Sequence, residues 1–280
     1  MKKILYILDT FETGGAEKSL LDIAIQNKAA VSYFITIYKG NQLAELAKKN
    51  GIQVFQLNNT EKYGFSKAVQ QIIPLIKEIQ PDIIHSTLFR ADIIARRLKK
   101  HFSMPLISSL VNNSYISERY EKLSVLGKLK LYGIQKYDAF TAKQVDLFIS
   151  NSQTIKESNA KHLHLHPDKI KVIFRGRDFN KFQNIEQNRI SQLKKELGLT
   201  EEDQVLVNVS RLLERKGQLD FLAAFKELVP KNPQLKVVIA GEGGYRKTLE
   251  NAIAAYQLQD KVQLLGNRND IPVLLSLAAV

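Results

Sequence analysis

A doubly wound α/β fold, present in two domains, is the fold class that this sequence of 280 residues predicts. Short apolar runs alternate with amphipathic stretches along nearly the whole chain. Most of these runs are continuous, which is typical of parallel strands covered on both faces. The pattern is interrupted once and then restarts. The expected strands are residues 3–8, 33–38, 52–57, 82–86, 105–111, 147–151, 170–174, 204–210, 235–241 and 262–266.

The first elements follow from local patterns. The apolar run at the N-terminus ends at Asp9 with no small-residue cleavage site after it, so it predicts a strand and not a signal peptide. The next stretch carries an apolar stripe that includes Ala16 and Leu20, as an amphipathic helix does. A second stripe at 68–76 predicts another helix, which Pro74 should kink. No apolar run reaches the roughly 18 residues of a transmembrane helix.

The interruption marks the domain boundary. Residues 175–182 are polar and turn-like, and a charged helix at 188–197 precedes the next strand. We therefore expect a first domain at 1–175 and a second, partial domain at 176–280. The second domain has three expected strands and ends in the apolar segment 271–280, whereas chain ends normally lie in solvent. We expect this second fold to be incomplete.

Composition narrows the function classes. Cysteine is absent, which excludes disulfides, thiolate nucleophiles and zinc-thiolate sites and is compatible with the cytoplasm. The formal net charge is +13, from 41 Lys+Arg and 28 Asp+Glu. Such a charge favours nucleic acid, an anionic membrane surface or a phosphorylated ligand as partner, unless the cations are only solvated helix faces. No RNP, helix-turn-helix or zinc pattern occurs, so nucleic acid is not an expected partner.

The positive charge is concentrated in one region. Residues 90–144 carry eleven basic and four acidic residues. Within residues 118–144, leucines and aromatic residues are interleaved with the lysines, which suits a helical region on an anionic lipid surface. The expected location is the cytoplasm, with peripheral binding to the inner face of the cytoplasmic membrane.

Two loops carry candidate binding residues, because ligands of open α/β sheets bind beyond the carboxyl ends of the strands. After the first strand, Gly14 and Gly15 permit a sharp turn, and the amides of the following helix can hold an anion. A bare Gly-Gly pair is also common in plain turns. Arg211 ends a strand and Lys216 precedes a helix, so together they could clamp a diphosphate. The alternative is that both are ordinary loop charges.

The run His162-Leu-His-Leu-His166 alternates as metal ligands on a strand would. It contains no cysteine or acid and falls in an expected connecting loop, so we expect no metal site there.

Several motifs occur along the chain in one order. They are Gly14-Gly-Ala-Glu17, Ile149-Ser-Asn-Ser152, Ile173-Phe-Arg-Gly-Arg-Asp178, Val209-Ser-Arg211 with Lys216-Gly217, Ile239-Ala-Gly-Glu-Gly243 and Leu264-Leu-Gly266. In this order the chain resembles the retaining glycosyltransferases of family 4, also called glycosyltransferase group 1, which have the GT-B fold.

The resemblance implies two Rossmann-like domains, of which the second binds a nucleoside diphosphate sugar and the first an acceptor, with no metal or other cofactor. It implies that Arg211 and Lys216 contact the donor diphosphate, and that Gly14 and Gly15 form a loop at the phosphate and acceptor. It further implies a nucleoside-binding loop, which consists of Gly266, Asn267 and Arg268.

The sequence departs from the family pattern in three places. The E-x7-E motif of the family should follow the next strand, and the chain ends before it; Glu242 and Glu250 have that spacing but lie too early. The family's H-x-H becomes His85-Ser-Thr87, in which His85 is either a catalytic residue that orients sugar or acceptor, or an ordinary strand-end histidine. The usual Asn-Gly between the domains is Arg175-Gly176.

The activity that the resemblance implies is transfer of a sugar, with retention, to a hydroxyl of a glycan or lipid-linked acceptor, in cell-surface polysaccharide or lipopolysaccharide synthesis. Two alternatives remain from the sequence. One is another GT-B activity, a sugar-nucleotide epimerase or hydrolase. The other is a non-catalytic GT-B-like binding protein, because the E-x7-E motif is missing from the chain.

Overall fold

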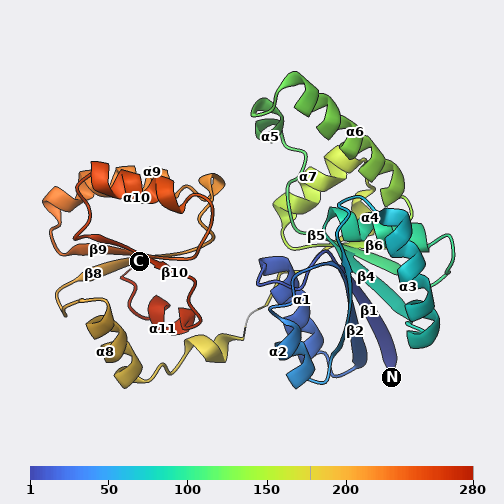
Figure 1. Ribbon diagram of the computed structural model, residues 1–280, viewed down its shortest axis with the longest axis horizontal. Helices are drawn as coiled ribbons and strands as arrows, with labels where there is room; N and C mark the ends of the chain where they lie inside the picture. Colours follow the sequence, from blue (N-terminus) through green and yellow to red (C-terminus); the bar gives the residue numbers. More distant parts are fainter. Residues whose placement is uncertain (177, 280) are drawn as a thin grey trace. The chain divides into compact units, whose positions relative to one another are not determined.

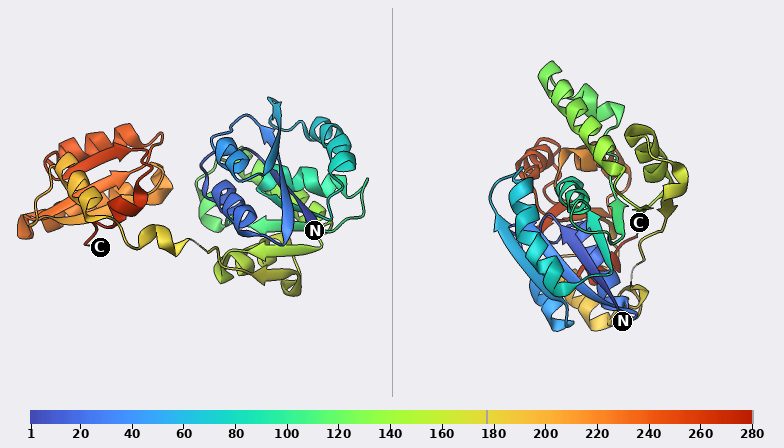
Figure 2. Two further views of the ribbon diagram at one scale, coloured as in Figure 1. Left: turned by 90° about the horizontal axis from the view of Figure 1, so that it is seen from below. Right: turned by 90° about the vertical axis from the view of Figure 1, so that its right-hand side faces the viewer.

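The computed structural model describes residues 1–176 and 178–279 of the chain. It divides into two compact units, Met1–Gly176 and Arg177–Val280, which we call unit 1 and unit 2 (Figures 1 and 2). The boundary lies one residue beyond the one expected from the sequence.

Unit 1 contains a seven-stranded parallel sheet with the order β3-β2-β1-β4-β5-β6-β7. The strand order reverses between β1 and β4, and this switch point is where ligands of open α/β sheets bind. The strands are β1 (Lys2–Leu8), β2 (Ala30–Tyr38), β3 (Gln53–Asn59), β4 (Ile83–Thr87), β5 (Leu106–Leu110), β6 (Leu147–Ser150) and β7 (Ile170–Val172).

Helices cover both faces of this sheet (Figure 1). Helices α1 (Gly15–Gln26) and α2 (Ala44–Lys49) close one core, around Phe11 and Phe34. The second core lies on the other face and includes α3, α4, α6 and α7. These helices, with the short α5, are α3 (Phe65–Ile79), α4 (Phe89–Leu98), α5 (Ser117–Glu121), α6 (Val125–Ala142) and α7 (Gln153–Leu163). Helix α3 continues for five residues past Pro74 and does not end there.

Unit 2 contains a parallel sheet of β8 (Gln204–Val209), β9 (Leu235–Ala240) and β10 (Val262–Gly266) in the order β10-β9-β8. Helices α9 (Gln218–Leu228) and α10 (Arg246–Ala255) cover one face, and α8 (Gln187–Glu196) and α11 (Ile271–Leu275) cover the other. Each face has its own apolar core, around Phe225 and Val238 respectively.

The expected α/β class is confirmed, since each expected strand is present at its place in the chain. The ends of the strands differ from the expected ones by no more than three residues, which is the usual precision of a boundary read from sequence. Over the described residues, the structure has no helix with the length and apolar character needed to cross a bilayer.

Candidate functional site

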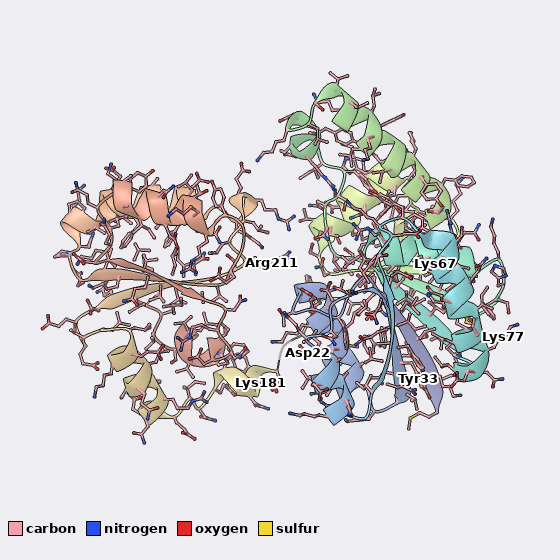
Figure 3. The ribbon with its side chains drawn as sticks, viewed as in Figure 1. Asp22, Tyr33, Lys67, Lys77, Lys181 and Arg211 are labelled. Atoms are coloured by element: carbon pink, nitrogen blue, oxygen red, sulfur yellow. The ribbon has the colours of Figure 1, made fainter. Side chains whose placement is uncertain are left out.

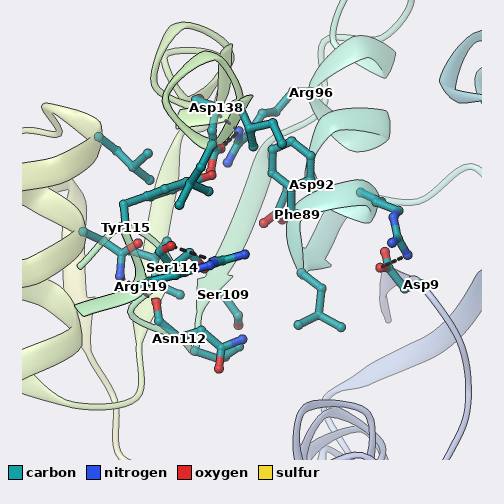
Figure 4. A pocket seen from close by; sticks show the side chains of 18 of the residues that line it. Asp9, Phe89, Asp92, Arg96, Ser109, Asn112, Ser114, Tyr115, Arg119 and Asp138 are labelled. Carbon is teal, nitrogen blue, oxygen red and sulfur yellow. Dashed lines mark hydrogen bonds and ion pairs between the residues drawn. The ribbon is translucent and has the colours of Figure 1, made fainter. Parts of the chain in front are cut away.

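A cavity of about 410 Å³ lies in unit 1 at the carboxyl ends of β1, β4 and β5 (Figure 4). Its wall includes residues within two positions of the ends of these strands, among them Asp9, Phe89 and Asn112. The opposite wall comes from α6 and from the segment between β5 and α6, which contributes Tyr115 and Arg119. The cavity therefore occupies the switch point of the sheet and combines polar, cationic and aromatic side chains.

Asp9 is the carboxylate at the end of the first strand. It accepts a hydrogen bond from the backbone N–H of Ala91 at 3.0 Å and pairs with the guanidinium of Arg90 at 3.5 Å. Burial raises the pKa of Asp9 to about 6, although Arg90 acts in the opposite direction. Asp9 can therefore exchange a proton close to neutral pH within the cavity.

The turn that presents Phe89 and Arg90 is strained. Leu88, which precedes α4 and lines the cavity, has a φ of 75°, in the left-handed region that a leucine rarely adopts. Such strain persists where surrounding contacts enforce it and is common at binding sites.

Part of the cavity wall is a buried polar network between α4, α6 and the loop after β5. The Arg96 guanidinium pairs with the Asp138 carboxylate at 2.5 Å, and the Tyr115 hydroxyl donates to the same carboxylate at 2.7 Å (Figure 4). One turn before Arg96, Asp92 accepts a hydrogen bond from the Ser86 hydroxyl at 2.6 Å. The network fixes Tyr115, and with it the loop that carries Asn112 and Arg119, onto α4 and α6.

His85, the candidate catalytic residue, is a buried side chain of β4. Its Nε2 lies 2.8 Å from the hydroxyl of Ser109, and its ring lies against that of Tyr6 at 5.3 Å. Burial, with a smaller contribution from Arg175, lowers the pKa of His85 to about 4, so the imidazole is neutral at pH 7. Ser109 lines the cavity, and His85 can therefore act there through Ser109. Its catalytic role stays a prediction.

Gly14 and Gly15 lie where α1 begins, since Gly14 is the N-cap and Gly15 the first helical residue. A side chain at Gly14 would collide with the carboxylate of Glu17, which is itself buried. The guanidinium of Arg175 donates to the carbonyl of Gly15 at 3.0 Å. Charged side chains of both signs thus surround the loop for which the sequence predicts contact with phosphate or acceptor.

In unit 2, Arg211 and Lys216 lie at the two ends of the connection between β8 and α9. Both side chains are exposed, and Figure 3 shows Arg211 at the periphery of the unit. The turn is held by Gln218, which is fully buried and donates to the carbonyl of Arg211 at 3.0 Å and to the hydroxyl of Ser210 at 2.9 Å. Gly217, with a φ of 70°, then starts α9. Two cations therefore flank a helix N-terminus, as a diphosphate site needs.

Two glycines after β9 allow the loop that contains them to pack directly on the connection between β8 and α9. A Cβ at Gly241 would overlap the backbone of Ser210, and one at Gly243 would overlap the backbone of Leu212. The Gly-Glu-Gly turn is therefore required by close backbone approach beside Arg211. Glu242 in that turn and Glu250 in α10 both pair with Arg246, at 2.5 and 3.0 Å.

The expected nucleoside-binding loop follows β10. Gly266 ends the strand with a φ of 73°, and the Asn267 side chain is exposed. The guanidinium of Arg268 pairs with Glu196 and Asp270, both at 2.6 Å, which raises the pKa of Arg268. Arg268 therefore fastens the loop to α8, and Asn267 is the exposed polar side chain of the three.

The histidine run does not form a metal site in the part of the chain that the structure describes. His162 belongs to α7 and bonds the carbonyl of Ser158 at 2.7 Å, His164 is the left-handed residue that ends the helix, and His166 is exposed. Among residues 1–176 and 178–279, no three histidine, cysteine, aspartate or glutamate side chains lie close enough to share an ion.

Comparison with known proteins identifies the family. Residues 13–181, more than half of the chain, match the model of Glycosyltransferase Family 4, and residues 189–280 match that of Glycosyl transferases group 1. The chain belongs to this glycosyltransferase family.

Two curated relatives are particularly informative. The UDP-Gal:alpha-D-GlcNAc-diphosphoundecaprenol alpha-1,3-galactosyltransferase of Escherichia coli is 30% identical over 76% of this chain and 54% of its own length. The alpha-monoglucosyldiacylglycerol synthase of Streptococcus pneumoniae is 27% identical over 72% of this chain and 45% of its own. The chain thus spans about half the length of these relatives.

The fold is similar to that of Anabaena Alr3699/HepE, whose crystal structure contains UDP and glucose. The TM-score is 0.81 at 23% identity, over 99% of this chain and 72% of that one. This similarity confirms the GT-B class for the fold of the chain.

Sequence reasoning found the glycine turns and the cations of unit 2 but missed the cavity wall of unit 1. Asp9 could have been noticed, because it is the polar residue that ends the first apolar run. Arg96, Tyr115 and Asp138 had no such signal, since only the tertiary fold brings them together.

Proposed function

We propose that the complete protein transfers a sugar from a nucleoside diphosphate sugar to an acceptor hydroxyl, with retention at the anomeric carbon. The observation that carries this proposal is the exposed pair Arg211 and Lys216 beside the N-terminus of α9, in the unit that matches the group 1 family model. The HepE structure, with UDP and glucose bound to a similar fold, supports a nucleotide donor.

In this reaction the bond between the anomeric carbon and the diphosphate oxygen breaks, and a bond to the acceptor oxygen forms on the same face. Negative charge develops on the departing diphosphate, and its freed oxygen takes the proton that the acceptor hydroxyl loses. Arg211 and Lys216 stabilise that charge together with the amides at the start of α9. These groups can supply the stabilisation without a metal ion. In the same proposal, Gly266, Asn267 and Arg268 line the nucleoside, and Gly14 and Gly15 border the reacting groups.

The acceptor binds in the cavity of unit 1. The name of the first curated relative includes a diphosphoundecaprenol-linked sugar, and the second is named for the synthesis of a glucosylated diacylglycerol; both molecules are lipids. We therefore place the reaction in the synthesis of a cell-surface polysaccharide or lipopolysaccharide.

A membrane-facing surface accompanies this acceptor. Helix α6 exposes the side chains of Val125, Leu126 and Leu129 by 76%, 77% and 64%, and lysines lie between and beyond them. Apolar side chains flanked by cations favour peripheral binding to an anionic bilayer. We propose that the protein is cytoplasmic and binds the inner face of the cytoplasmic membrane.

The donor site is tested by calorimetric titration of the chain with UDP, GDP and ADP. We expect one of the three to bind, and expect the double variant Arg211→Ala/Lys216→Ala to lose this binding. Because charge-assisted hydrogen bonds are worth about 1.5–3 kcal/mol each, the loss should be at least about a hundredfold. In the complete protein, Arg211→Ala should lower kcat by orders of magnitude with the fold unchanged.

Lys247, an exposed cation in the same unit, provides the matched control, since Lys247→Ala should bind nucleotide like the unchanged chain. If the double variant binds as well as the unchanged chain, the assignment of Arg211 and Lys216 is wrong. If no nucleotide binds, the titration is repeated with a chain as long as the relatives. A product analysis with and without acceptor then distinguishes transfer from hydrolysis or epimerisation.

A further inference from the structure

We propose that an aromatic groove along α6 binds the hydrocarbon chain of the acceptor, which makes the acceptor a lipid with a phosphate-containing headgroup. The inference deepens the function proposed above and rests on the cavity of unit 1 being the acceptor site. The groove is a hollow of about 320 Å³. Its lining consists of Tyr63, Phe65, Phe89, Gly133, Ile134 and Tyr137, with Lys130 as its one charged residue.

The groove is continuous with the acceptor cavity. Tyr63, Phe89 and Ile134 line both, so a ligand can leave the cavity directly along these three side chains. On the far side, Tyr137 also borders a third hollow of about 470 Å³, which contains the exposed Phe140. Residues 130, 133, 134 and 137 follow one face of α6 at helical spacing. The three hollows therefore adjoin one another along this helix.

The chemistry changes from the cavity to the groove. Around the cavity, Lys62 and Arg119 are cations, and the guanidinium of Arg90 is paired with the carboxylate of Asp9. Asp92 and Asp138 also line it, but they are buried and bonded to Ser86 and to Arg96 and Tyr115. Cations around a polar cavity suit a phosphate ester. In the groove, apolar and aromatic side chains replace these polar groups, and a hydrocarbon chain gains free energy by covering them.

The position of the groove indicates where the hydrocarbon comes from. The exposed apolar side chains proposed to face the bilayer, which include Leu126, Leu129 and Tyr132, belong to the same helix. A lipid whose chain lies along α6 can keep its far end in the bilayer while its headgroup occupies the cavity.

The groove can be filled without disturbing the fold, because Gly133 faces open space. No atom lies within 4 Å of a Cβ built there, beyond the local helix backbone. Gly133→Phe should occupy the groove, whereas the matched control Gly133→Ala leaves it open and suits a helix better than glycine. Tyr63→Glu, at a side chain that is 51% exposed, provides an independent change that places a charge in the groove.

The probes are decyl phosphate below its critical micelle concentration and methyl phosphate, titrated calorimetrically. We expect decyl phosphate to bind the unchanged chain and Gly133→Ala at least tenfold more tightly than methyl phosphate. In Gly133→Phe and Tyr63→Glu this difference should shrink to less than threefold. Methyl phosphate should bind Gly133→Phe as it binds the unchanged chain, whereas Tyr63→Glu should weaken both probes, because Tyr63 also lines the cavity. Equal binding of both probes to the unchanged chain, or a tenfold preference retained in both groove variants, would overturn the inference.

The donor titration separates this inference from the proposed function. Gly133→Phe lies in unit 1 and should bind the nucleotide as the unchanged chain does. If nucleotide binds and the chain-length preference is absent, only the lipid groove is wrong. If the preference is present and no nucleotide binds even at full length, the groove stands as a lipid site and the transfer reaction is wrong.

Discussion

Asp92 is the residue that should give unit 1 its clearest pH response. Burial raises its pKa from 3.8 to about 6, against the attraction of Arg96 and hydrogen bonds from Ser86 and Ser108. Because the folded state holds the proton more tightly than the unfolded state, Asp92 contributes stability below pH 4 that is lost as the pH rises through 6. Asp92→Asn cannot ionise. We therefore expect this variant to gain stability relative to the unchanged chain between pH 4 and 7.

The gain should be on the order of 1–3 kcal/mol, from the size of the pKa difference. Urea unfolding of both proteins at pH 4.5 and 7.5 measures this gain. The difference between their free energies of unfolding is compared at the two pH values, because only its change with pH reports the ionisation of Asp92. A difference that stays constant over this range, or that shrinks, would show that Asp92 is not held in its protonated form. Ser86 and Ser108 are retained in both proteins, so that the network changes only in charge.

At the scale of elements, one buried ion pair joins α6 to α4. Arg96 and Asp138 have side chains exposed by 2% and 11%, and Thr141 also accepts from the guanidinium at 3.0 Å. Asp138→Asn leaves a buried guanidinium without its carboxylate and weakens the bond to Tyr115. We expect a loss of about 3–5 kcal/mol in the free energy of unfolding of unit 1.

The control for this prediction is Lys2→Gln, which breaks an ion pair in the same unit whose lysine is 75% exposed. This variant should change the stability far less, since water replaces the lost partner. Equal effects of the two variants in denaturant unfolding would mean that α6 does not depend on the buried pair.

The elements also show how far sequence reasoning reaches. Strands such as β1 and β9 could be predicted because their apolar runs are continuous and local. The glycines at 241 and 243 were visible as a motif, although the reason for them, contact with the backbone at 210–212, is tertiary. The position of His85 against Tyr6 and Ser109 could not be predicted, because it depends on which strands become neighbours.

The whole chain has a formal net charge of +13, which attracts any anionic surface. A test of the proposed membrane binding must therefore show that the lysines of α6 matter more than exposed lysines elsewhere. We expect the chain to sediment with vesicles that contain an anionic phospholipid at low salt. It should not sediment with zwitterionic vesicles. Lys128→Gln/Lys136→Gln removes two cations next to the exposed apolar side chains of α6. Each near-surface cation contributes about 1 kcal/mol, so binding should fall by about tenfold or more.

Lys48→Gln/Lys49→Gln is the matched control for Lys128→Gln/Lys136→Gln. Both of its lysines are exposed at the end of α2 in the same unit, and both double variants have the same net charge. If charge alone drives binding, the two double variants lose the same affinity, and α6 has no special role. If α6 rests on the bilayer, the loss is confined to Lys128 and Lys136. Leu126→Ser should then weaken binding at unchanged charge, because hydrophobic insertion of α6 and electrostatic attraction act together.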